Sequence, residues 1–418
     1  MKLTKYKLGE ILDVTRGASL SGEFYATEGK YIRLTCGNFD YQNNCFKENK
    51  SKDNLYYVGD FKSDFLMEEG DIITPLTEQA IGLLGSTAII PESGKYIQSQ
   101  DVAKIICKEE LLDKDFAFYL ISSTLVKQQL SAAAQQTKIR HTSPDKIRDC
   151  TVWIPELAEQ KRIGKLLRSL DRKIELNRAI NQNLEAMAKQ LYDYWFVQFD
   201  FPNKDGKPYK SSGGELVWNE KLKRMIPKEW TNANIYQLAS ISKETVNPQA
   251  QPNELFKHYS LPEYDKTGTY AEEYGIDIQS AKFIVTNNCI LVSKLNPWTS
   301  RVICGNRGSN QICSTEFVVW NPASLKTKGF LFMLAKSAKF IEYCTQGATG
   351  TSHSHRRINP ELMMKFDFPY NSEIAIKFSL LIENIIVHLH NNIAQLKVLT
   401  EQRDELLPLL MNGQITIE

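Results

Sequence analysis

The sequence runs through the same series of segments twice. Residues 8–16 align with 235–243, and residues 70–73 align with 288–291. Further pairs continue in the same order: 101–102 with 316–317, 116–120 with 330–334, and 153–155 with 367–369. The offset between aligned positions falls only from 227 to 214 residues along the chain, which is typical of a duplication followed by a few loop insertions and deletions. We therefore expect two copies of one unit, a pseudo-twofold repeat suited to a partner with two related half-sites.

Length and composition set broad limits. A chain of 418 residues is too long for one ordinary core, so two domains are the natural count. The formal charge of +2 excludes no partner, because 51 basic and 49 acidic residues can still be segregated by face. The eight cysteines form no C-x-x-C pair and no secretory signal opens the chain, so we expect reduced thiols, no metal site and a cytoplasmic protein. No apolar run approaches the roughly 18 residues of a membrane span, so no membrane association is expected.

Residues 1–150 are typical of a mixed α/β domain. Short apolar runs alternate with clusters of Gly, Pro, Asn and Asp that indicate turns. The predicted strands are 31–34, 71–74, 86–90 and 102–106. One helix is expected from 114 to 134, where apolar side chains recur at helical spacing. The domain should end near Pro155.

Two later stretches, 156–197 and 371–412, predict long helices. Their apolar residues recur in steps of three and four, which is the pattern of a coiled-coil seam. The first seam comprises Ile163, Leu167, Leu170, Ile174, Asn177, Asn181, Leu184, Ala188 and Leu191. The second comprises Ile382, Ile386, Leu389, Ile393, Leu396 and, less regularly, Arg403 and Leu407. We expect the helices to form an antiparallel coiled coil, which would place the two domains at opposite ends of one rod.

Two asparagines, Asn177 and Asn181, interrupt the first seam. A buried polar residue at such a position can fix the helix register at some cost in stability. A seam that faces solvent or another protein would tolerate the same residues. The sequence leaves both interpretations open.

The halves are joined by residues 201–214, which are rich in Pro, Gly, Ser and Lys and so predict an exposed connector. Apolar residues follow at once and should pin its far end to the second domain. These anchors are Trp218, Met225, Ile226, Pro227 and Trp230.

Motifs that would indicate an enzyme are missing. The sequence contains no G-x-x-x-x-G-K-[ST] phosphate loop and no G-x-G-x-x-G cofactor loop. Asp-Phe-Pro-Tyr at 367–370 resembles the Asp-Pro-Pro-Tyr box of amino-methyltransferases, but its second residue is Phe. His353 and His355 have no acidic or cysteine residue nearby, and the arginines that follow would repel a cation. We expect no catalytic residue, no metal and no cofactor.

Binding chemistry is better represented, in the polar segments that precede the long helices. Residues 132–143 combine small, hydroxyl and basic side chains, and residues 347–357 do so at the equivalent place in the second half. Such side chains read base edges and hold phosphates. One such segment is more often a solvated loop, but its recurrence favours binding. With polar residues of other turns, the candidates for DNA contact are Arg16, Ser19, Arg33, Gln79, Gln100, Lys138, Arg140, His141, Lys243, Lys294, Asn296, Arg301, Arg307, Ser352, His353, His355, Arg356 and Arg357.

Four stretches carry a resemblance to a known family. They are 153–163, 202–214, 290–297 and 313–318, and with the two long helices they resemble the specificity subunit of type I restriction-modification systems. The Pro-x-Leu-x-Glu-Gln motif at 155–160, directly before the first long helix, is the most specific part. The corresponding stretch at 368–373 departs from that motif.

The resemblance implies an α+β fold, with two mixed α/β target-recognition domains joined by two long helices. The implied divisions are target-recognition domain 1 at 1–155, a central spacer helix at 156–197, a linker at 198–214, target-recognition domain 2 at 215–370 and a C-terminal spacer helix at 371–412. Each domain would read one half of a split double-stranded DNA target.

The resemblance also implies a set of partners. The chain itself would be non-catalytic, and it would dock two methyltransferase subunits together with restriction and translocase subunits. Those partners would supply S-adenosylmethionine, ATP hydrolysis and cleavage. The alternative is a non-catalytic coiled-coil protein that joins two ligand- or peptide-binding domains. A third reading, an enzyme with an unfamiliar site, would require activity from the chain alone.

Overall fold

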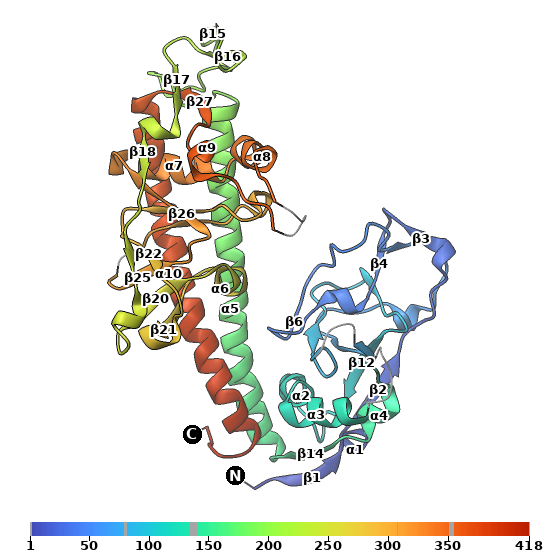
Figure 1. Cartoon of the computed structure of the whole chain (residues 1–418). Coiled ribbons are helices and arrows are strands. Elements are labelled where there is room, and N and C mark those ends of the chain that lie inside the picture. Colours follow the sequence, from blue (N-terminus) through green and yellow to red (C-terminus); the bar gives the residue numbers. More distant parts are fainter. Residues whose placement is uncertain (1, 79–81, 134–139, 307, 351–354, 418) are drawn as a thin grey trace. The chain divides into compact units, whose positions relative to one another are not determined.

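The computed structural model describes residues 2–78, 82–133, 140–306, 308–350 and 355–417. The chain divides into two compact units, Met1–Ile174 with Val398–Glu418, and Glu175–Lys397. Each unit combines short strands and helices with one part of each long helix (Figure 1). The expected α+β fold class is confirmed.

The first unit begins with short strands and ends on the first half of a long helix. Its elements are β1 (Thr4–Lys7), α1 (Leu8–Ile11), β2 (Leu12–Arg16), β3 (Tyr25–Ala26), β4 (Tyr31–Arg33), β5 (Phe39–Asp40), β6 (Cys45–Phe46), β7 (Tyr56–Tyr57), β8 (Ile72–Pro75), β9 (Thr77–Glu78), β10 (Ala88–Ile89), β11 (Tyr96–Ile97), β12 (Val102–Cys107), α2 (Lys114–Ile121), α3 (Thr124–Ala133), β13 (Arg140–His141), α4 (Pro144–Arg148), β14 (Thr151–Ile154) and α5 (Leu157–Tyr192). Strands β4, β8, β10 and β12 confirm the four strands that the sequence predicts.

The main sheet of this unit has the strand order β10-β8-β12-β2, and every pair in it is antiparallel. Alternate side chains of a strand point to the same face, so Val14, Ile72 and Ile105 enter one buried cluster with Phe116 and Leu120 of α2. A smaller sheet, β11-β4-β7-β3, contains the parallel pair β4 and β11. Strands β1 and β14 form a separate antiparallel pair.

The second unit repeats these parts. Its elements are β15 (Leu216–Asn219), β16 (Arg224–Pro227), β17 (Thr231–Asn234), β18 (Ala239–Ile241), β19 (Thr245–Val246), β20 (Leu255–Tyr259), α6 (Leu261–Thr267), β21 (Ala271–Tyr274), β22 (Lys282–Ile284), β23 (Ile290–Ser293), β24 (Val302–Cys304), β25 (Gln311–Cys313), β26 (Phe317–Pro322), α7 (Lys328–Ala335), α8 (Ala338–Gln346), α9 (Pro360–Met363), β27 (Asp367–Tyr370) and α10 (Ser372–Met411).

The main sheets of the two units match in topology, whereas the smaller sheets differ, with four strands in β11-β4-β7-β3 and five in β19-β22-β25-β20-β21. The sheet β24-β23-β26-β18 has the order of β10-β8-β12-β2, and its pairs are again antiparallel. The pair β17 and β27 corresponds to β1 and β14, and the parallel pair β20 and β25 corresponds to β4 and β11. The repeat predicted from weakly similar segments is therefore present in the fold.

The single helix expected at 114–134 is wrong, because the structure has two helices, α2 and α3. The Ser122 hydroxyl donates to the main-chain carbonyls of Phe118 and Tyr119, and the Ser123 amide donates three residues back, to Leu120. Such local bonds compete with the helical pattern and end α2. The second copy has the same break, where the Ser337 side chain accepts from the Phe340 amide and starts α8.

The long helices confirm the predicted seams. In the first unit Ile163, Leu167 and Ile174 of α5 are buried, and in the second unit so are Ile382 and Leu389 of α10. The helix expected to reach 197 leaves regular α geometry earlier, because Asp193–Val197 forms a π turn. There the Phe196 ring packs on Phe330, with ring centroids 4.7 Å apart.

Polar pairs between the helices run antiparallel in both units. In the second unit Asn177 donates to Gln395 at 3.2 Å and Asn392 donates to Asn181 at 3.0 Å. In the first unit Arg403 donates to Asp171 at 3.1 Å, and the Tyr119 hydroxyl donates to the same carboxylate at 2.5 Å. Numbers rise on one helix as they fall on the other, and both asparagines face the opposite helix.

The connector is less exposed than expected. Phe201 is buried, and its ring stacks on Tyr209 and on Trp230. Asp200 accepts hydrogen bonds from the amide and hydroxyl of Ser211. Aromatic residues inside the Pro- and Gly-rich stretch therefore fold it back on itself, in addition to the anchors that follow it.

All eight cysteines are free thiols. None of the described helices is both long and apolar enough to cross a bilayer. Among the described residues no three His, Cys, Asp or Glu side chains gather as metal ligands would.

Candidate nucleic-acid interface

In the first unit, three segments meet where β8 ends. The Leu76 amide donates to the Asp101 carbonyl at 2.8 Å, and the Leu76 carbonyl accepts from the Thr142 amide at 2.8 Å. Next to it, Thr77 of β9 lies opposite His141 of β13 in an antiparallel pair. We call Leu76, Thr77, Asp101, His141 and Thr142 the first junction.

Side chains of the first junction form a chain of polar contacts. The Thr77 hydroxyl lies 3.4 Å from Asp101 Oδ1 and 3.2 Å from His141 Nδ1. His141 is exposed, whereas Thr77 and Asp101 are partly covered. The Thr77 hydroxyl thus contacts Nδ1 of the imidazole, and the His141 side chain is otherwise exposed to solvent.

In the second unit, the same three segments meet where β23 ends. The Lys294 amide donates to the Glu316 carbonyl at 2.9 Å, and the Lys294 carbonyl accepts from the Ile358 amide at 3.0 Å. Leu295 pairs with Arg357 in an antiparallel bridge. We call Lys294, Leu295, Glu316, Arg357 and Ile358 the second junction.

Three side chains of the second junction are charged, namely Lys294, Glu316 and Arg357. Arg357 Nε donates to both oxygens of Glu316, at 2.9 and 3.2 Å, and its Nη2 donates to one of them at 3.0 Å. This contact raises the pKa of the Arg357 guanidinium. The Arg357 side chain is 45% exposed, so a ligand can reach it.

Other candidates of the first unit gather beside its junction. Arg16 is exposed, and its Nε donates to the Gln100 carbonyl at 2.8 Å. Gly17 permits this approach, because a Cβ there would lie 2.2 Å from the Gln98 carbonyl oxygen. Ser19, two residues after Gly17, is exposed. The structure therefore brings Arg16, Ser19, Gln100 and His141 to one edge of the unit.

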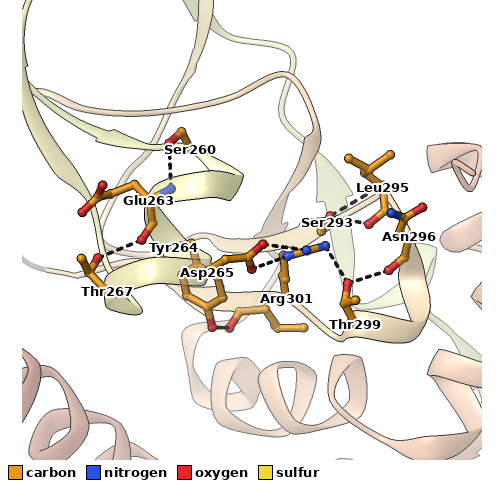
Figure 2. Close-up of polar contacts among 11 residues, drawn as sticks. Ser260, Glu263, Tyr264, Asp265, Thr267, Ser293, Leu295, Asn296, Thr299 and Arg301 are labelled. Atoms are coloured by element: carbon orange, nitrogen blue, oxygen red, sulfur yellow. Dashed lines mark hydrogen bonds and ion pairs between the residues drawn. The ribbon is translucent and has the colours of Figure 1, made fainter. Parts of the chain in front are cut away.

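The second unit gathers its candidates around the loop after β23, and Figure 2 shows Asn296 and Arg301 of this loop. Asn296 has a left-handed backbone with φ of 48°, its amide donates to the Arg356 carbonyl, and its side-chain oxygen accepts from the Arg356 amide. These bonds join the loop to the segment that carries exposed His355 and Arg357. Lys294, Asn296, His355, Arg356 and Arg357 thus lie together.

Arg301 supports this loop. Figure 2 shows its guanidinium on the carboxylate of Asp265, with bonds of 2.6 and 2.7 Å, and on the hydroxyl of Thr299 at 2.6 Å. Its side chain is only 15% exposed. The arginine therefore braces α6 against the loop, a placement that favours a supporting role over direct contact.

Arg33 is a correction to the candidate list. It is 7% exposed, its guanidinium lies 3.8 Å from the ring centroid of Tyr25, and one of its nitrogens donates to the Asn54 carbonyl. The stacking of the guanidinium on Tyr25 and its bond to Asn54 hold the arginine inside the small sheet. It is a packing residue.

Several candidates lie outside the described residues. These are Gln79, Lys138, Arg307, Ser352 and His353. Arg140 is described only as a backbone position of β13. Lys243 is exposed just beyond β18, at the position that corresponds to Arg16 at the end of β2.

The sequence reasoning missed the acidic residues of this region. Asp101 and Glu316 are one of the aligned pairs of the repeat, but a search for phosphate-binding side chains passes over carboxylates. Asp265 lies in α6, outside the aligned segments of the repeat. A signal for the first two was present, namely an acid that recurs one residue before the same buried strand, β12 or β26.

An open pocket of about 640 Å³ lies beside the second junction. Its polar lining includes His258, Ser260, Asp265, Lys282, Arg301 and Glu316. Burial lowers the pKa of Lys282. Burial also lowers the pKa of His258, although its Nδ1 lies 2.5 Å from Glu273. Both signs of charge therefore meet in this pocket, next to the candidate DNA contacts.

The sequence is similar to those of known proteins. Residues 2–186 match the model of the type I restriction modification DNA specificity domain. The MjaIX specificity subunit of Methanocaldococcus jannaschii is 22% identical over 333 residues, which cover 77% of this chain and 73% of that protein. The HindI specificity subunit of Haemophilus influenzae is 23% identical over 377 residues, covering 77% and 81%.

A solved structure gives the same result for the fold. The S subunit of a type I restriction-modification system from M. genitalium superposes with a TM-score of 0.63 at 15% identity, over 98% of this chain and 96% of that one.

Proposed function

Because the chain belongs to the family of type I restriction-modification specificity subunits, we propose that it selects DNA by reading a split target, one half-site for each recognition domain. The observation that carries this proposal is the recurrence of one junction in both units. Two equivalent backbone frames with different side chains suit two half-sites of different sequence.

The division of labour follows from the side chains. Phosphate contacts position a protein on DNA, and contacts to base edges specify the sequence. Exposed Arg16 and Lys243 occupy equivalent strand ends and suit phosphates. The junction residues, held by backbone bonds on all sides, suit base edges. We assign target-recognition domains to 1–155 and 215–370 on this basis.

The long helices would serve as the spacer between half-sites. Helix α5 has 36 residues, about 54 Å at 1.5 Å per residue. Half-sites read from one face should lie about one helical turn of DNA apart. Deleting four residues from each helix at paired positions should shorten the preferred gap by about 6 Å, or roughly two base pairs. An unchanged gap would refute the spacer role.

We further propose that the helices dock two methyltransferase subunits, and that restriction and translocase subunits complete the complex. The chain would be the non-catalytic member, and S-adenosylmethionine and ATP would be bound by the partners. Purified chain without partners should therefore neither methylate nor cleave DNA.

Sequencing of methylated adenines in the source genome tests the proposal directly. Deleting the gene should abolish methylation of one split motif and leave other motifs unchanged. Persistence of every methylated motif would count decisively against the proposed function.

Salt dependence separates this proposal from a coiled-coil protein with two ligand- or peptide-binding domains. Binding through phosphates releases counterions, so affinity for the target duplex should fall steeply between 50 and 200 mM salt, by roughly a thousandfold for six or more contacts. Salt-insensitive binding of a peptide or small molecule, with no DNA binding, would favour the alternative.

A further inference from the structure

We infer that Asp101 and Glu316 are equivalent positioning residues, and that each sets the hydrogen-bonding character of the basic side chain that its domain presents to one base. The inference rests on the proposed function and deepens it, because it names the class of base that each side chain selects. The first junction should select an amino group of adenine or cytosine. The second should select guanine.

The backbone makes the two acids equivalent. The Asp101 carbonyl accepts from the amide of Leu76, directly after β8, at 2.8 Å. The Glu316 carbonyl accepts from the amide of Lys294, directly after β23, at 2.9 Å. Leu76 and Lys294 in turn accept from the segment that carries the basic side chain. Both acids directly precede the neighbouring strand, β12 or β26. The match holds although Asp101 and Glu316 are different residues.

At the second junction the acid occupies one side of a guanidinium. Arg357 uses Nε and one hydrogen of Nη2 for Glu316. A guanidinium has five donors, and among the described residues those of Nη1 and the second of Nη2 are not used by Glu316. Two such nitrogens on one edge match O6 and N7 of guanine, the commonest specific contact of arginine with DNA. The carboxylate thus turns this edge outward.

At the first junction the acid acts through a hydroxyl. If Thr77 donates to Asp101, at 3.4 Å, its oxygen is left to accept from His141 Nδ1, at 3.2 Å. The neutral imidazole then carries its proton on Nδ1, and Nε2 becomes an acceptor. An acceptor in the major groove pairs with the amino group of adenine or cytosine and meets no donor on guanine or thymine.

A carboxylate beside DNA also repels the phosphates and so weakens binding to DNA of any sequence. This effect distinguishes a positioning residue from one that simply attracts DNA. Removing Glu316 should strengthen binding to unrelated DNA, because a negative charge is lost. Discrimination at its base should fall at the same time. A residue that only supported folding would weaken binding to all sequences together.

The test uses the full chain with its methyltransferase subunits, a randomised duplex pool and sequencing of the bound fraction. Glu316→Gln should relax selection of one guanine in one half-site by about tenfold and leave the other half-site unchanged. Thr77→Val should relax, by about tenfold, the preference for adenine or cytosine over guanine or thymine on one strand at one position of the other half-site, and Thr77→Ser should restore it. Glu109→Gln and Glu229→Gln remove exposed carboxylates away from the junctions and should leave selectivity unchanged.

The outcomes separate the inference from the proposed function. If the wild-type complex selects a split motif but neither variant relaxes a single position, the positioning role fails and the proposed function stands. If Glu316→Gln relaxes the same G·C pair even when Arg357 is replaced by Lys, the acid reads the base pair without the arginine and the inference also fails. If no split motif is selected, the proposed function fails, and the inference fails with it.

Discussion

The two copies differ in the polar contacts between their parts of the long helices, which are buried in the first unit and more exposed in the second. The first unit closes its helix pair with a charged contact, Arg403 on Asp171, and both side chains are about 10% exposed. The second unit closes its pair with neutral amides, Asn177 on Gln395 and Asn392 on Asn181.

The backbone around these contacts is alike in topology, which explains how the side chains of the two copies could diverge. Main-chain bonds such as those of the junctions do not depend on side-chain identity, so they survive substitution. Buried polar side chains do depend on identity, because each needs its own partner. The same fold can therefore contain an ion pair with a large desolvation penalty in one copy and amides with a small one in the other.

The largest expected effect on stability comes from removing one member of the ion pair. Arg403→Met should lower the free energy of unfolding by about 3–5 kcal/mol, because it leaves the Asp171 carboxylate buried without its cation. Urea denaturation followed by circular dichroism measures the loss. The Tyr119 hydroxyl would still donate to Asp171, but a single neutral donor does not replace a charge.

The matched control replaces both partners. Asp171→Leu combined with Arg403→Met should recover most of the lost stability, since an apolar pair of similar volume often equals a buried ion pair. A single variant that unfolds within about 1 kcal/mol of the wild type would contradict the buried character of the contact.

A smaller effect is expected from the amides of the second unit. Asn181→Ala and Asn392→Ala should each cost about 1 kcal/mol, the ordinary net value of a hydrogen bond, and their effects should not add. A double-mutant cycle by urea denaturation measures the coupling. Additive losses would show that the two side chains do not recognise each other, and would return these positions to a tolerated polar seam.

The sequence predicted the repeat, the helix seams and four strands of the first domain, because all depend on periodicity and on segment order. It failed at Ser122, where a side-chain bond to the backbone ends a helix that periodicity would continue. It also failed at Arg33, since no pattern distinguishes an arginine stacked on Tyr25 from one in solvent. The two junctions could not be predicted from the sequence for another reason. Residues such as Asp101 and His141 come together only through strand pairing.

The smallest expected difference between the copies is in their response to acid. Burial lowers the pKa of two histidines of the second unit, His258 and His390. The first unit contains one histidine among its described residues, His141, and it is exposed. The neutral form is thus favoured in the folded second unit, so its stability is complete above the unfolded pKa near 6.5 and is lost as the pH falls below it.

Acid titration of histidine variants tests whether His258 and His390 cause this sensitivity to acid. Lowering the pH from 7.5 to 5.5 should lower the melting temperature. The free energy of unfolding should fall by at most about 1.4 kcal/mol per pH unit for each histidine. His258→Gln and His390→Gln should flatten this dependence, whereas His388→Gln, on the exposed face of α10, should leave it unchanged. An equal slope in all three variants would mean that carboxylates rather than the buried histidines set the acid sensitivity. The two copies would then be alike in this respect, and the difference in their buried polar groups would be confined to the helix pair.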